Sequence, residues 1–135
     1  MSKSRALVTA ELFAWIDHAL SKDLPRQTVS FHFNLYEGHD SVHIQLMGTD
    51  RFEPGEVPER DYWPGLETFS AGEQVFEIPF SVAGSDWKQW FATCKDMLCA
   101  YIAEGDRSGV LRASQGVGAG FVDGDVHVLW RPHTA

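Results

Sequence analysis

The chain has 135 residues, of which 44% are hydrophobic and 13% aromatic, the composition of one globular domain large enough to fold without disulfides or metal. Its formal net charge of −8 argues against nucleic-acid binding, because phosphate contacts require clustered basic residues and the eleven lysines and arginines are scattered. No apolar run approaches the roughly 20 residues of a membrane span, and no signal peptide is expected. The acidity favours either simple solubility or a basic partner.

The two cysteines, Cys94 and Cys99, lie five residues apart in one predicted helix, which separates them by about 140° around its axis. They cannot bridge each other, and reduced thiols in a small domain are typical of the cytoplasm. We therefore expect a cytoplasmic protein in which residues 1–135 form a single domain.

The first helical pattern runs between Thr9 and Pro25. Thr9 is the predicted N-cap, Glu11 falls in the first turn, and Pro25 stops the pattern. The apolar positions that recur at helical spacing are Leu12, Ile16, Ala19 and Leu20.

From Thr28 the apolar period changes to two, which predicts a strand, a turn over residues 37–40 and a returning strand. We expect Tyr36 to pair with Ser41. That register would set Leu35 opposite Val42, Phe33 opposite Ile44 and Phe31 opposite Leu46.

The stretch from Gly48 to Gly72 holds six acidic residues and two arginines, so it carries −4 of the net charge of −8. A connection this long without a periodic pattern is usually functional or disordered. Aromatic residues among acids suit docking onto a basic protein, although an aromatic pair can also pin a loop onto the core. The residues expected to bind a partner are Glu53, Glu56, Glu59, Asp61, Tyr62 and Trp63, with Asp123 and Asp125 as a second patch.

Residues 75–80 predict a third strand at or near a sheet edge, because Pro79 cannot donate to a ladder. Ser85 and Asp86 are the predicted cap of a second helix, and Gly105 ends it. Its apolar stripe, which we interpret as core, consists of Trp87, Trp90, Phe91, Cys94, Leu98, Tyr101 and Ile102.

The last thirty residues predict a weak strand over 110–113 and then two strands, over 117–122 and 125–130. The pair Asp123-Gly124 between the last two runs indicates a hairpin. Since helices do not alternate with single strands, a doubly wound parallel sheet is not expected. We predict an α+β fold in which a mainly antiparallel sheet of about five strands has two helices packed on one face.

Two histidines, His32 and His43, share the polar face of the first hairpin, where the predicted register sets His43 opposite Asn34. With a third ligand they could bind zinc, but no Cys or carboxylate accompanies them at ligand spacing. We prefer a solvated or partner-facing surface, on which two histidines would weaken partner binding below about pH 6.5.

Two other strings resemble sites. Asp123, Asp125 and His127 would share one face of a continuous strand, but the Asp-Gly turn competes with that arrangement. The G-x-G-x-G string over 116–120 lacks the helix that must follow a nucleotide loop, so we expect a bulge or close packing of a helix over the sheet. With no catalytic motif in the chain, we expect no enzyme activity, no cofactor and no metal.

The second half resembles the immunity proteins that bacteria make against polymorphic or contact-dependent toxins. The residues concerned are Trp87, Trp90 and Phe91 before Cys94-Lys95, and the ending from Gly120 through Trp130. The resemblance implies a stoichiometric inhibitor that covers the active site of a cognate toxin, often a basic nuclease. These proteins share no catalytic motif, so the resemblance assigns no individual site residue.

Two other classes remain open. A secretion chaperone, whose order of helices and strands this chain partly resembles, would dimerise and bind an extended effector segment. A small-ligand or metal-binding domain would use a pocket between helix and sheet, lined by His32, His43 and Tyr36.

Overall fold

The computed structural model describes residues 3–22, 24–50, 67–70, 75–122 and 126–132. Six strands form one sheet in the order β3-β2-β1-β5-β6, and β4 also pairs with β2. The elements are α1 (Arg5–Leu20), β1 (Ser30–Glu37), β2 (Ser41–Thr49), β3 (Glu67–Ser70), β4 (Phe76–Pro79), α3 (Phe80–Ala83), α4 (Trp87–Glu104), α5 (Ser108–Arg112), β5 (Gly116–Phe121) and β6 (His127–Trp130).

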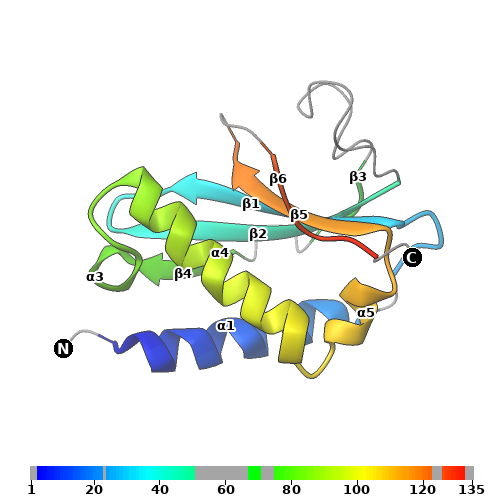
Figure 1. Cartoon of the computed structure of the whole chain (residues 1–135), viewed down its shortest axis with the longest axis horizontal. Helices are drawn as coiled ribbons and strands as arrows, with labels where there is room; N and C mark the ends of the chain where they lie inside the picture. Colours follow the sequence, from blue (N-terminus) through cyan, green and yellow to red (C-terminus); the bar gives the residue numbers. More distant parts are fainter. Residues whose placement is uncertain (1–2, 23, 51–66, 71–74, 123–125, 133–135) are drawn as a thin grey trace.

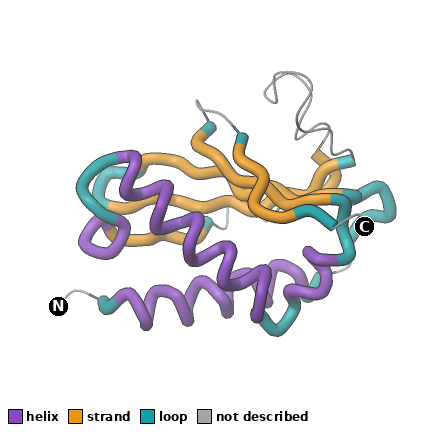
Figure 2. The backbone as a smooth tube through the Cα atoms, in the orientation of Figure 1, coloured by secondary structure: helices purple, strands orange, loops and turns teal. Residues whose placement is uncertain are grey.

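The predicted α+β fold is confirmed. The sheet is five positions wide, because β3 and β4 pair with different parts of β2, and its pairs are antiparallel except for β1 with β5. Both long helices, α1 and α4, lie on the same side of the sheet and run in the same direction (Figures 1 and 2). None of the described helices has the length and apolar character needed to cross a bilayer.

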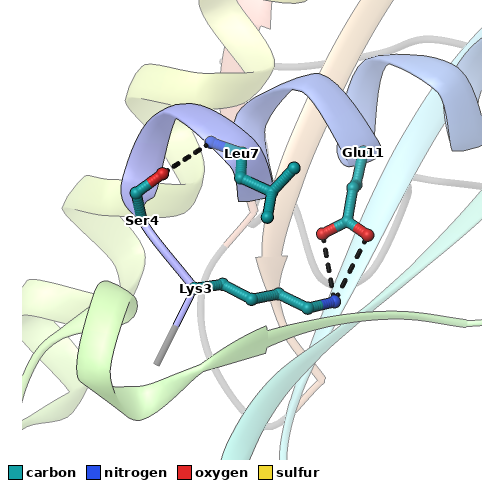
Figure 3. Close-up of polar contacts among 4 residues, drawn as sticks. All are labelled: Lys3, Ser4, Leu7 and Glu11. Atoms are coloured by element: carbon teal, nitrogen blue, oxygen red, sulfur yellow. Dashed lines mark hydrogen bonds and ion pairs between the residues drawn. The ribbon is translucent and has the colours of Figure 1, made fainter. Parts of the chain in front are cut away.

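The first helix begins earlier than predicted. Ser4, not Thr9, is the N-cap, and its hydroxyl accepts a hydrogen bond of 3.1 Å from the Leu7 amide (Figure 3). Lys3, just before the helix, forms an ion pair of 3.1 Å with Glu11 in its second turn. Thr9 lies inside the helix, where its hydroxyl donates to the Arg5 carbonyl four residues before it, at 2.7 Å.

The first hairpin is present, but its register differs by two residues from the predicted one. Tyr36 pairs with His43, and Leu35 pairs with Ile44, because the four-residue loop between the paired residues spans 38–41 and not the predicted 37–40. Gly38 closes that turn with a hydrogen bond of 2.8 Å from its amide to the Ser41 carbonyl. A shift of two residues keeps every side chain on its predicted face, so the apolar side of the hairpin still packs into the core.

One buried cluster joins the helix-facing side of the sheet to the helices. Tyr101 links the two long helices: its ring meets Phe13 edge-on at 5.1 Å, and its hydroxyl donates to Asp17 at 2.5 Å. The fully buried members of the cluster include Leu12 and Ile16 of α1, Phe33 and Leu35 of β1, Ile44 and Leu46 of β2, Ile78 of β4, Leu98 of α4 and Ala119 of β5.

The segment between α4 and β6 corrects one prediction and confirms another. Residues 110–113, predicted as a weak strand, belong mostly to the short helix α5, because a run this short has no clear period and Leu111 is buried equally well from a helical turn. β5 and β6 pair antiparallel, as predicted, and their register shifts between Val117 and Gly118. The predicted turn at Asp123-Gly124 lies outside the described residues.

The G-x-G-x-G string over 116–120 was expected to form a bulge or to pack closely under a helix. The register shift in β5 is such a bulge, so the first expectation is confirmed. Gly116, Gly118 and Gly120 pair with Ser30, His32 and Asn34, on the sheet face opposite α1 and α4. Close packing of a helix over these glycines was the other expectation, and neither of the long described helices, α1 and α4, provides it.

The third predicted strand and the second helix are present. β4 pairs with β2 along one side, and Pro79 ends it, as expected for an edge position. Asp86 caps α4 by accepting a hydrogen bond of 2.9 Å from the Gln89 amide, and Gly105 is the C-cap. The short strand β3, inside the acidic stretch, was not predicted.

Candidate functional site

The residues predicted to bind a partner lie outside the described part of the chain. This holds for the first patch and for the second, which comprise Glu53, Glu56, Glu59, Asp61, Tyr62, Trp63, Asp123 and Asp125. The described residues form a candidate site elsewhere.

A hollow of about 300 Å³ opens at one end of the sheet. The carboxyl ends of the parallel strands β1 and β5 meet the first turn of α4 there (Figure 1). We call it the aromatic hollow; it is lined by Leu35, Tyr36, Glu37, Trp87, Trp90, Phe121 and Val122.

Two apolar side chains at the aromatic hollow are exposed. Trp87 is 61% exposed and Val122 is 53% exposed, and among the described residues the other large exposed hydrophobic side chain is Leu7 on α1. Trp87 was predicted to belong to the core stripe of α4, and that prediction is wrong. The core stripe begins one turn later, at Trp90.

The inner wall of the aromatic hollow is held rigidly. The Trp90 ring stacks on Phe80 with centroids 4.7 Å apart and planes 6° from parallel, and it lies 6.5 Å from the Phe121 ring. Its indole nitrogen donates to the Gly84 carbonyl at 2.8 Å. Since that donor is already used, Trp90 offers a partner an apolar surface and no hydrogen bond.

Three charged side chains are described at or beside the aromatic hollow. Glu37 lines it and is exposed. The Asp86 carboxylate sits at the N-terminus of α4, where it offsets the positive end of the helix dipole. The ammonium group of Lys88 lies 5.7 Å from the centroid of the Trp87 ring, within cation–π range.

The two histidines of the first hairpin do not form a common site. His43 lies opposite Tyr36, not Asn34, and His32 lies opposite Met47, so four residues, or about 13 Å, separate them along the strands. His43 bonds to Glu77 at 3.0 Å. Both histidines and Tyr36 occupy the sheet face opposite α1 and α4. Tyr36 lines the aromatic hollow and the two histidines do not, so the three side chains do not line one pocket together.

His32 is buried, with 3% of its surface exposed. Burial lowers the pKa of His32 to about 4, while a hydrogen bond with Asn34 acts in the opposite direction. The side chain is therefore neutral at physiological pH. Within the described ranges, no group of three or more His, Cys, Asp or Glu side chains is placed to hold a metal ion.

The thiols lack the character of nucleophiles. Cys94 is fully buried on the core side of α4, as predicted, and burial raises its pKa to about 12. Burial also raises the pKa of Cys99. Nucleophilic cysteines have a lowered pKa, so neither thiol is activated.

Comparisons of the chain with models of protein families, with curated proteins and with solved structures found no match.

Sequence reasoning missed the aromatic hollow for a physical reason. Trp87 continues the helical spacing of the core residues of α4, and that spacing predicts burial. The ends of β1 and β5, at Glu37 and Phe121, determine whether the sheet covers the first turn of α4. The spacing of apolar residues within α4 does not contain that information. A tryptophan directly after a predicted N-cap was the one available signal.

Proposed function

We propose that the protein is a stoichiometric inhibitor of the immunity-protein class, which neutralises a cognate basic toxin in the cytoplasm by covering its active site. The observation that supports this most is the aromatic hollow, which exposed Trp87 and Val122 line together with Glu37. Tryptophans at the centre of protein interfaces contribute much of the binding free energy, so an exposed one beside a hollow favours a protein partner.

The charge of the protein indicates which kind of partner it binds. The net charge of −8 favours a basic partner, and carboxylates of the inhibitor would stand in for the phosphates that such a toxin binds. In this proposal the acidic stretch steers association and the aromatic residues hold the complex. The steering residues would be Glu53, Glu56, Glu59 and Asp61, with Tyr62 and Trp63 beside them and Asp123 and Asp125 as a second patch.

Affinity purification of the tagged chain from its native host tests the proposal. We expect one basic protein in a one-to-one complex, recovered well at low salt and less well at moderate salt because screening weakens steering. A toxic activity of that protein should disappear when the chain is added in equimolar amount.

Two results would count against the inhibitor. The first is a dimer that recovers no basic partner and instead binds an unfolded peptide, which is the behaviour of a secretion chaperone. The second is a basic partner whose activity persists when it is saturated with the chain. Mass spectrometry of the intact complex distinguishes these outcomes by stoichiometry.

A further inference from the structure

We propose that the aromatic hollow binds the guanidinium group of one arginine side chain from the partner. This inference rests on the proposed function and names the chemistry that the partner presents at this site. The observations that carry it are the volume of the hollow, its aromatic walls, its carboxylate and the lysine already placed over Trp87.

The volume of the aromatic hollow suits a single side chain. Pockets for small molecules span about 300–1,000 Å³, and the aromatic hollow, at about 300 Å³, is at the lower end of that range. This volume accommodates one long side chain. A single side chain of a docked protein therefore fits this space.

The walls favour a cation that is flat. Arginine stacks on aromatic faces and loses less hydration free energy on burial than an ammonium group does. Trp87 presents a largely exposed ring, and the Lys88 ammonium group lies 5.7 Å from its centroid, so a cation can approach that ring. Inside the hollow, the rings of Trp90 and Phe121 supply further apolar surface.

The carboxylate supplies the opposite charge. Glu37 lines the aromatic hollow, and a guanidinium group can donate two parallel hydrogen bonds to one carboxylate. A helix N-terminus normally repels cations, but Asp86 caps α4 and offsets its positive end. Lys88 is the one positive side chain described beside Trp87, so it should compete with an incoming arginine.

The test uses n-butylguanidinium as the probe and n-butylurea as its neutral counterpart. NMR spectra of the 15N-labelled chain follow the indole signals, which single Trp→Phe variants assign. We expect n-butylguanidinium to shift the Trp87 signal with saturable millimolar binding and n-butylurea to leave it unchanged. This measurement needs no partner protein, so it tests the site separately from the inhibitor function.

Four variants test the residues that form the site. Trp87→Ala, followed by the Trp90 indole signal, should abolish binding of n-butylguanidinium, and Glu37→Gln should weaken it about threefold or more. Lys88→Gln should tighten it about twofold, because the competing cation is gone. Lys95→Gln, an exposed lysine two turns further along α4, serves as the matched control and should change nothing.

Several outcomes would overturn the proposal. Equal shifts with n-butylurea would show that charge is irrelevant, and no shift with either probe would show that the hollow does not bind this group. Tighter binding of n-butylammonium would assign the hollow to lysine. If a partner is captured and inhibited, but Trp87→Ala leaves its affinity unchanged, the inhibitor stands and the arginine site fails.

Discussion

At the scale of single residues, Tyr101 ties three segments together. Its ring is fully buried against Phe13 of α1, and its hydroxyl donates to Asp17 of the same helix. The same oxygen accepts a hydrogen bond of 3.2 Å from the Arg107 amide, just after α4. Burial and the hydrogen bond to Asp17 raise the pKa of Tyr101, so the phenol remains neutral in the folded protein.

Tyr101→Phe should therefore lower the free energy of unfolding by about 1–3 kcal/mol, because it leaves the Asp17 carboxylate and the Arg107 amide without this partner. Urea denaturation at neutral pH measures the change. Tyr36→Phe is the matched control: it removes a hydroxyl that donates to Gln45 at 2.8 Å on the half-buried sheet face. A loss as large in the control would contradict the special role of Tyr101.

His32 gives the protein a predictable response to acid. The folded state lowers its pKa to about 4 from the ordinary value of 6.5, so the unfolded chain binds the proton more readily. Stability from this group is complete above about pH 6.5 and is lost progressively as the pH falls toward about 4. Urea denaturation between pH 4 and 7 should show a shallower pH dependence for His32→Gln than for the unchanged chain. Parallel curves would refute the assignment to His32.

At the scale of elements, the junction between α3 and α4 depends on Gly84. Its φ is 122°, a conformation that side-chain-bearing residues rarely adopt, and an added Cβ would come within 2.5 Å of the Gln89 Cβ. The Gly84 carbonyl accepts a hydrogen bond from the Trp90 indole, and the Ser85 amide donates to the Gln89 side chain in the first turn of α4. The inner wall of the aromatic hollow thus depends on one glycine in a short connection.

Gly84→Ala should lower the free energy of unfolding by about 1–3 kcal/mol, because both the backbone conformation and the contact with Gln89 become strained. Gly109→Ala is the counterpart in the short helix α5, where an added Cβ meets nothing within 4 Å. That change should stabilise the fold by about 0.5–1 kcal/mol, because alanine favours a helix more than glycine does. Equal effects of the same sign in chemical denaturation would contradict this account.

At the scale of the whole molecule, the sequence predicts the fold better than the site. Alternating apolar residues in β1 and β2 and the cap at Asp86 are local signals, so they identify the hairpin and the second long helix. The parallel pairing of β1 with β5 joins residues more than eighty positions apart, and no local pattern encodes it. The aromatic hollow lies at the ends of those two strands, so it could not be predicted either.

The acidic stretch should steer association with a basic partner. Changing Glu56, Glu59 and Asp61 to Lys should slow association with the basic partner about tenfold or more at low salt, because charge accelerates the encounter over distances up to the Debye length. Stopped-flow association rates measure this, and the melting temperature should stay nearly unchanged. The effect should shrink as salt is added.

A matched variant separates position from net charge. Changing Asp96, Glu104 and Asp106 to Lys alters the net charge by the same amount, but these exposed acids lie along or just after α4, away from its N-terminal turn at the aromatic hollow. If the acidic stretch faces the partner, this second variant slows association much less. If both variants slow it equally, steering comes from the net charge of the molecule, and the acidic stretch has no position in the interface. Because the aromatic hollow is tested with a small probe, that result would leave the arginine site intact.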